Sequence, residues 1–182
     1  TILAHAARLI GSRAPFKGKR VLVTAGPTRE PIDPVRVVSN RSSGRMGYRL
    51  AEAAWERGAT VTLVSGPVDQ PAPIGVERVR VESTAQMEAA VRDALPSADV
   101  LIMAAAPADY RPVAPATGKR PRQDGATAIP MEPTADILAG SVNLRKKGAV
   151  MVGFALETGD AVAKGKTKLA RKQLDLIVVN DA

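Results

Sequence analysis

The sequence contains no cysteine, which excludes disulfides, thiolate nucleophiles and thiolate metal sites together. Its single histidine, His5, lies near the N-terminus. A zinc site built from several histidines is therefore excluded, and a Ser-His-Asp triad would depend on that one residue. The absence of cysteine also fits a reducing compartment, so we expect a cytoplasmic protein.

Aromatic residues are scarce, with two Phe, two Tyr and one Trp among 182 residues. The net charge of +8 fits nucleic acid, an anionic membrane or small phosphorylated ligands as partners. Single-stranded nucleic acid is usually bound on aromatic stacking platforms, so the shortage of aromatics counts against it. No apolar run reaches membrane-spanning length, and no signal peptide is visible. We therefore expect small phosphorylated ligands, no nucleic acid and no membrane partner.

Strand-like apolar runs alternate with helical spacing along the chain. The pattern predicts strands at residues 20–25, 60–65, 77–81, 99–106, 149–155 and 175–180, and helices at 2–10, 46–57, 84–95, 135–147 and 160–172. Nearly continuous apolar strands are typical of a parallel sheet covered on both faces. We predict a doubly wound, mostly parallel Rossmann-like α/β fold, with ligands bound after the first, fourth and fifth strands.

The loop after the first strand, residues 24–47, ends in SNRSSGRMG and runs into a helix. Small residues there leave backbone N–H groups open at a helix N-terminus, which favours phosphate and makes Ser42, Ser43 and Gly44 candidate ligand residues. The alternative is that a serine only caps the helix. The amide of Asn40 can donate to a phosphoryl or acyl oxygen and accept from an amine, although an ordinary turn asparagine also fits.

Two further loops carry candidate residues. In AAAPADYRP, the small side chains of Ala104 and Ala105 let a base or ribose lie against the backbone. Asp109 suits a ribose hydroxyl or Mg²⁺ beside a polyphosphate, or simply a turn. In the proline-rich segment after it, Lys119 of GKRPR suits a mobile loop that closes over a polyphosphate, or a solvated loop tip.

The last predicted helix places Lys164, Lys168 and Lys172 on one face, because their spacing is four residues. Like charges on one face repel, so this lysine ridge indicates an anionic partner, although a solvated helix face also explains it. Phe154 ends the fifth predicted strand and lies either in the core or against a base.

Together these segments resemble the synthetase domain of the bacterial bifunctional phosphopantothenoylcysteine decarboxylase/synthetase of coenzyme A synthesis. The matching stretches occur in family order and cover about residues 19–181: VLVTAGPTREPIDPVRVVSNRSSGRMG, AAAPADYRP, GKRPR, ADIL, VGFALET and KLARKQLDLIVVND. The resemblance implies a ligase that activates 4′-phosphopantothenate with CTP and Mg²⁺ to an acyl-cytidylate and pyrophosphate. Cysteine then displaces CMP. Orientation and charge stabilisation suffice for such chemistry, which needs no protein nucleophile.

The resemblance also implies roles for individual residues. Asn40 would bind the acyl-nucleotidyl intermediate and Lys119 the triphosphate, although GKRPR departs from a lysine-rich family pattern. The Asp109 match lies at the nucleotide and is the candidate metal ligand. The implied nucleotide contacts are Ala104, Ala105, Asp109, Lys119, Ala135, Asp136, Ile137, Leu138, Phe154, Lys168 and Lys172.

At the scale of domains, the resemblance implies that residues 1–18 are a linker helix from an N-terminal decarboxylase domain that carries FMN and is absent from this chain. Residues 19–182 would be the synthetase domain, with a C-terminal tail missing. The segment 110–133 would be a strap that packs on a second subunit of a homodimer and completes each active site.

Two alternatives stay open. An NAD(P)-dependent reductase would need a G-x-G-x-x-G fingerprint after the first strand and usually a Tyr-x-x-x-Lys pair. The fingerprint is missing, Tyr48 is followed at that spacing by Glu52, and Tyr110 by Ala114. A basic nucleic-acid-binding module would show salt-dependent affinity for polynucleotide instead of saturable binding of a mononucleotide.

Overall fold

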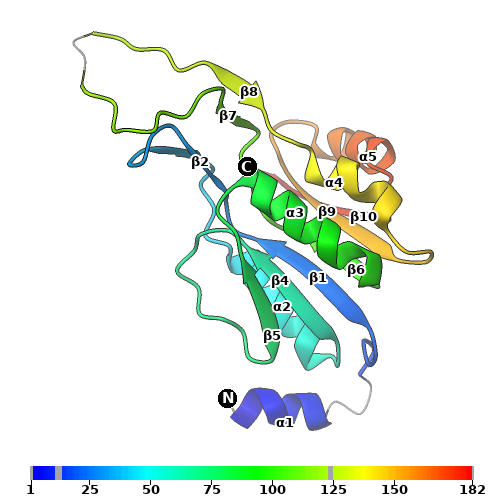
Figure 1. The fold of residues 1–182 in the computed structure, drawn as a ribbon. Helices are drawn as coiled ribbons and strands as arrows, with labels where there is room; N and C mark the ends of the chain where they lie inside the picture. Colours follow the sequence, from blue (N-terminus) through cyan, green and yellow to red (C-terminus); the bar gives the residue numbers. More distant parts are fainter. Residues whose placement is uncertain (1, 11–13, 123–124, 182) are drawn as a thin grey trace.

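A computed structural model describes residues 2–10, 14–122 and 125–181. Its central sheet has the strand order β10-β9-β6-β1-β4-β5, with every neighbouring pair parallel (Figure 1). The strands are β1 Arg20–Ala25, β4 Thr60–Ser65, β5 Val76–Arg80, β6 Val100–Met103, β9 Val150–Glu157 and β10 Leu176–Asp181. The chain builds outward from β1 to β5, then returns to β6 and builds the other way. This doubly wound order confirms the predicted fold and puts a topological switch point between β1 and β6.

Helices cover the sheet on both faces. Helix α2 (Arg45–Glu56) packs on one face, and α3 (Thr84–Ala94) and α4 (Ile137–Ser141) pack on the other (Figure 1). Leu169 of α5 (Ala161–Arg171) joins the α3 and α4 side. Because side chains alternate along a strand, Val21 and Val23 of β1 face α2 while Leu22 faces the other core. This two-sided burial explains the continuous apolar run of β1.

Close packing fixes α2 over the carboxyl end of β1. A Cβ atom on Gly47 would lie 2.5 Å from the Cβ of Ala25 and 2.8 Å from the carbonyl oxygen of Thr24. Only glycine fits that approach. Gly44, directly before the helix, has φ of 69°, a left-handed conformation that glycine adopts without strain.

Two hairpins extend from the carboxyl edge of the sheet, where the sequence predicted irregular loops (Figure 1). One pairs β2 (Arg29–Pro31) with β3 (Val37–Ser39), and the other pairs β7 (Tyr110–Pro112) with β8 (Met131–Pro133). The buried carboxylate of Asp33 accepts a hydrogen bond from the backbone N–H of Arg120 at 3.2 Å. The first hairpin therefore anchors the segment 110–133, the predicted strap, which we call the arm from here on.

Two predicted elements are shorter than expected. Strand β6 ends at Met103 and not at residue 106, because the N–H of Ala105 donates to the hydroxyl of Thr24 instead of continuing the ladder. The helix predicted at 135–147 is only α4 followed by a 3-10 turn, Val142–Leu144. The other predicted helices and strands agree with the structure to within about two residues.

The predicted N-terminal helix is present as α1 (Ile2–Ile10). The guanidinium of Arg8 lies 4.7 Å from the ring centre of Trp55. The ring centre of His5 lies 5.3 Å from that of Trp55, and the two rings make a T-shaped contact. Helix α1 thus rests on the C-terminal end of α2. Its role as a linker stays a prediction. Among the described helices, none has the length and apolar character needed to cross a membrane.

Candidate functional site

A cavity of about 260 Å³ lies at the carboxyl ends of β6 and β9, beside the switch point. It is lined by Met103, Ala105, Pro107, Ala108, Asp109, Thr134, Ala135, Asp136, Ile137, Leu138, Phe154 and Lys172. Eight of these were predicted as nucleotide contacts: Ala105, Asp109, Ala135, Asp136, Ile137, Leu138, Phe154 and Lys172. The parallel topology brings four separate segments to one edge of the sheet. Their ligand-binding role stays a prediction.

A buried polar network joins the loops on the two sides of the switch point. The hydroxyl of Thr28 accepts from the backbone N–H of Ala108 at 2.9 Å and lies 2.9 Å from the hydroxyl of Thr84. Glu30 is 3% exposed, and its carboxylate accepts from the N–H and the hydroxyl of Thr84, both at 2.8 Å. This network, which sequence analysis missed, holds the segment that carries Asp109.

Asn40 lies against the same segment from the other side of the switch point. Its side-chain N–H donates to the carbonyl oxygen of Pro107 at 2.9 Å, with a second contact of 3.4 Å to that of Ala106. These bonds orient the amide and leave its side-chain oxygen as the acceptor. Asn40 is therefore beside the cavity, although it does not line it.

The N-terminus of α2 shows that one alternative, a serine that caps this helix, is wrong. The residue at the N-cap is Gly44, and no side chain caps the helix. The hydroxyl of Ser42 accepts only from the N–H of Gly44, at 3.3 Å. Neither Ser42 nor Ser43 is therefore an ordinary helix cap, and the first-turn N–H groups stay available for a ligand.

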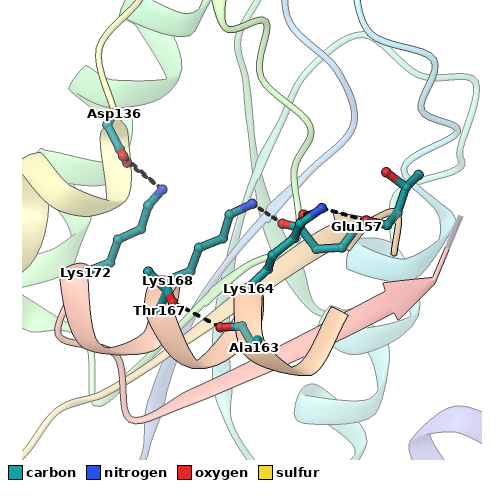
Figure 2. Close-up of polar contacts among 8 residues, drawn as sticks. Asp136, Glu157, Ala163, Lys164, Thr167, Lys168 and Lys172 are labelled. Atoms are coloured by element: carbon teal, nitrogen blue, oxygen red, sulfur yellow. Dashed lines mark hydrogen bonds and ion pairs between the residues drawn. The ribbon is translucent and has the colours of Figure 1, made fainter. Parts of the chain in front are cut away.

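Asp136 and Lys172 form an ion pair at the rim of the cavity (Figure 2). The Lys172 ammonium lies 3.0 and 2.9 Å from the two carboxylate oxygens. Asp136 also caps α4 by accepting from the N–H of Ala139 at 3.1 Å. Burial alone would raise the pKa of Asp136, but the bonds from Lys172 and Ala139 outweigh it and hold the pKa below its ordinary value.

The predicted lysine ridge is not a free basic surface. Figure 2 shows Lys164 and Lys168 directed at Glu157, the last residue of β9, while Lys172 meets Asp136. The hydrogen bond from Lys168 lowers the pKa of Glu157 below its ordinary value. Lys168 does not line the cavity. Sequence analysis missed Glu157 because it belongs to no charge pattern.

Five other predicted residues do not line the cavity: Ser42, Ser43, Gly44, Ala104 and Lys119. Ala104 turns the chain out of β6, with its N–H bonded to the carbonyl oxygen of Ile102 at 3.2 Å. Ser43 lies in the loop before α2. Lys119 lies on the arm, next to Arg120, whose backbone is held by the first hairpin.

Within the described ranges, no group of three or more His, Asp or Glu side chains is placed to hold a metal ion. Asp109 is exposed and lines the cavity, whereas Asp136, the other carboxylate of the lining, is paired with Lys172. Mg²⁺ in nucleotide sites typically takes one or two carboxylates and completes its shell with phosphate oxygens and water. The residues present fit that mode and not an all-protein metal site.

A larger cavity, of about 760 Å³, lies across the switch point at the carboxyl ends of β4 and β5. Arg29, Arg78 and Arg80 line it, but none of the predicted site residues does. Size alone does not identify a site. The smaller cavity is the candidate because the predicted carboxylates, lysine and aromatic side chain meet there.

These features define a doubly wound α/β protein whose candidate site lies at the switch point of the sheet. The chain belongs to the family described as the DNA/pantothenate metabolism flavoprotein C-terminal domain, which matches residues 16–182.

The names of similar proteins are consistent with this family. The coenzyme A biosynthesis bifunctional protein CoaBC of Vibrio cholerae is 49% identical over 166 residues, covering 90% of this chain and 42% of the relative. The protein of the same name from Bacillus subtilis is 47% identical over 169 residues, covering 92% and 41%. The chain thus spans about two fifths of the length of these relatives. A crystal structure of the C-terminal domain of CoaBC has a TM-score of 0.81 at 43% identity, covering 93% of this chain and 80% of that one.

Proposed function

We propose that this domain is a phosphopantothenate–cysteine ligase. It activates 4′-phosphopantothenate with CTP, releases pyrophosphate, and couples the acyl-cytidylate to cysteine with release of CMP. The observation that carries the proposal is the convergence of eight predicted nucleotide contacts on one cavity at the switch point. The names of the relatives, which are bifunctional proteins of coenzyme A biosynthesis, support the same activity.

The nucleoside of CTP occupies the cavity in this proposal. Ala105 and Leu138 offer apolar walls, and the half-buried ring of Phe154 lies against the base. A volume of about 260 Å³ suits a nucleoside whose phosphates extend out of the cavity. Lys172 stands at the rim, where its ammonium meets the phosphates.

The first step needs charge neutralisation and alignment. A carboxylate oxygen of the acid attacks the α-phosphorus of CTP, and the bond from that phosphorus to pyrophosphate breaks. Mg²⁺ would neutralise developing charge on the phosphates when bound. Asp109 is the carboxylate that would hold it, and the Thr28–Thr84–Glu30 network fixes the loop that carries Asp109.

The second step joins the cysteine nitrogen to the acyl carbon, and the bond from that carbon to the CMP oxygen breaks. The N–H groups of Asn40 are used by Pro107 and Ala106, so its side-chain oxygen is the atom left for substrate. We assign it to accept a hydrogen bond from the attacking amine. This orients the nitrogen without covalent participation of the protein.

A homodimer completes the proposed enzyme. Exposed apolar side chains gather on the two hairpins: Tyr110, Val113 and Met131 on the arm, and Val35 and Val37 on the β2–β3 hairpin. Such a patch fits a partner surface better than solvent. When the arm packs on a second copy of the chain, Lys119 contributes to the active site of that copy. The FMN implied for the family belongs to a decarboxylase domain outside residues 19–182.

Calorimetric titration tests the nucleotide assignment. With Mg²⁺ present, CTP should bind saturably, ATP more weakly, and NADPH not at all. Lys172→Ala should weaken CTP binding, whereas Lys147→Ala, an exposed lysine of the loop before β9, should not. Tight binding of NADPH would favour the reductase alternative and overturn the proposal.

A further inference from the structure

Glu157 occupies an unusual position for a carboxylate in an otherwise basic region. It ends β9, three positions after Phe154 of the cavity. Its side chain is only 11% exposed, and its two oxygens face different lysines (Figure 2). One oxygen accepts a hydrogen bond from Lys168, and the other lies 3.9 Å from the ammonium of Lys164.

This ion pair differs from those on the surface of the molecule. In the pair of Arg49 and Glu52, the side chains are 81% and 38% exposed, a setting in which such pairs contribute little. Glu157 is shielded from water, so its attraction to Lys168 is less screened. Glu157 is ionised at neutral pH even at its ordinary pKa, and the hydrogen bond from Lys168 lowers that pKa further.

The two lysines paired with Glu157 are held differently. The ammonium of Lys164 also donates to the carbonyl oxygen of Thr158 at 2.6 Å, so it ties the loop before α5 to the helix. Lys168 has no other partner among the described residues. Glu157 is therefore what fixes the position of the Lys168 ammonium.

A lysine side chain is flexible, and ordering its stem costs conformational entropy when it binds a ligand. A carboxylate that holds the ammonium in advance reduces that cost. The ammonium has three N–H donors, and Glu157 engages one of them, which leaves others for a phosphate. Glu157 also offsets the repulsion among three lysines on one helix face.

We propose that Glu157 is a positioning residue that holds Lys168 at the carboxyl edge of the sheet, ready for the phosphates of the nucleotide. The proposal rests on the proposed function and on the predicted role of Lys168 as a nucleotide contact outside the cavity. Glu157 itself does not touch the ligand. It acts through Lys168, in the way that a carboxylate orients a ligating side chain behind many binding sites.

The test is a double-mutant cycle on Glu157 and Lys168, with CTP kinetics measured in the full-length protein. Glu157→Ala should raise the KM for CTP about tenfold, as expected for a charged contact that is misplaced, and change kcat less than about twofold. Lys168→Ala should raise the KM at least as much. In the Lys168→Ala background, removing Glu157 should have no further effect, because the residue that it positions is gone.

Three controls make the outcome decisive. Glu157→Asp keeps the charge and should recover part of the CTP affinity. Glu157→Gln keeps the shape and an acceptor oxygen but removes the charge, so it should also raise the KM for CTP, and it serves if the alanine variant does not fold. Lys166→Ala removes an exposed charge from the same helix and should change nothing.

Contrary results would separate the role of Lys168 at the nucleotide from the positioning role of Glu157. A normal KM in Lys168→Ala would remove Lys168 from the nucleotide site and overturn this inference with it. A raised KM in Lys168→Ala but not in Glu157→Ala would overturn the inference alone. Additive effects in the double variant would show that Glu157 does not act through Lys168.

Discussion

Asn40 shows how one side chain can join the two halves of the sheet. It follows β3, yet its amide is fixed by the backbone of the loop after β6. From the sequence, the amide could donate to a phosphoryl or acyl oxygen and accept from an amine. The contacts to Pro107 and Ala106 favour the acceptor role, since the N–H groups are already engaged.

Replacement of Asn40 by aspartate should harm the second step more than the first. A carboxylate loses the N–H donors that hold it to Pro107 and repels the charge of the acyl phosphate. The acyl-cytidylate should therefore form but convert slowly, and mass spectrometry should detect it accumulating. Unchanged formation of the coupled product would remove Asn40 from the mechanism.

The lysines on α5 should differ in their effects. Lys172→Ala removes an ammonium from the cavity rim and leaves Asp136 without its partner, so CTP affinity should fall by about 1.5–3 kcal/mol. Calorimetry with CTP measures this loss, and Lys166→Ala is the matched control. An unchanged affinity would mean that Lys172 only balances the charge of Asp136.

At the scale of elements, the carboxyl end of β1 and the start of α2 form one unit. Gly47 permits their contact, and Gly44 turns the chain into the helix. The sequence indicated a phosphate site at this helix N-terminus, with Gly44 among its candidate residues. In the structure, Gly47 permits close packing of α2 on β1, and no side chain caps the N-terminus of the helix.

Gly47→Ala should destabilise the fold by about 1–3 kcal/mol, because the added Cβ would collide with Ala25 and the Thr24 carbonyl. Urea unfolding measures this change. Gly140→Ala in α4 is the matched control, since its Cβ would meet only a Glu88 oxygen at 3.8 Å, and it should be neutral or stabilising. Equal stability of both variants would contradict the packing assigned to Gly47.

The anchor of the arm should respond to acid. Burial of the Asp33 carboxyl would raise its pKa, but N–H donors from Val35, Arg36 and Arg120 and the Arg36 charge lower it below the ordinary value of 3.8. A lowered folded-state pKa means that the anchor is fully present above the unfolded pKa and is lost as pH falls through the folded one. Proteolysis of the arm should therefore accelerate only in acid.

Asp33→Asn supplies the comparison for that measurement. The amide cannot ionise, so the variant should be cleaved in the arm faster than the native protein at neutral pH and should show little further change in acid. An acid response that survives in Asp33→Asn would assign the effect to another group.

At the scale of the whole molecule, the sequence predicted the six strands of the sheet well, because strands buried on both faces, such as β1, read as unbroken apolar runs. It did not predict the two hairpins, whose short strands at Arg29–Pro31 and Tyr110–Pro112 carry no alternating pattern. Those strands depend on contacts with distant segments. The same limit hid Glu30, Thr84 and Glu157, which matter only through partners far along the chain.

The arm gives a prediction about assembly. Replacing residues 113–129 by a short Gly/Ser linker should convert a dimer at micromolar concentration into a monomer and weaken CTP turnover, because the arm carries exposed apolar residues and Lys119. Sedimentation of both forms measures this. A monomeric native protein, or a linker variant that dimerises and turns over CTP normally, would contradict the role of the arm.

In the proposed function, this domain forms and consumes an acyl-cytidylate. The most direct measurement follows pyrophosphate release from CTP with 4′-phosphopantothenate, first without and then with cysteine, in the full-length protein. We predict CTP-dependent pyrophosphate release that needs the acid, an acyl-cytidylate detected by mass spectrometry, and its conversion to the cysteine adduct and CMP when cysteine is added. Equal turnover with ATP would contradict the choice of nucleotide, and pyrophosphate release that is independent of the acid would contradict the activity itself.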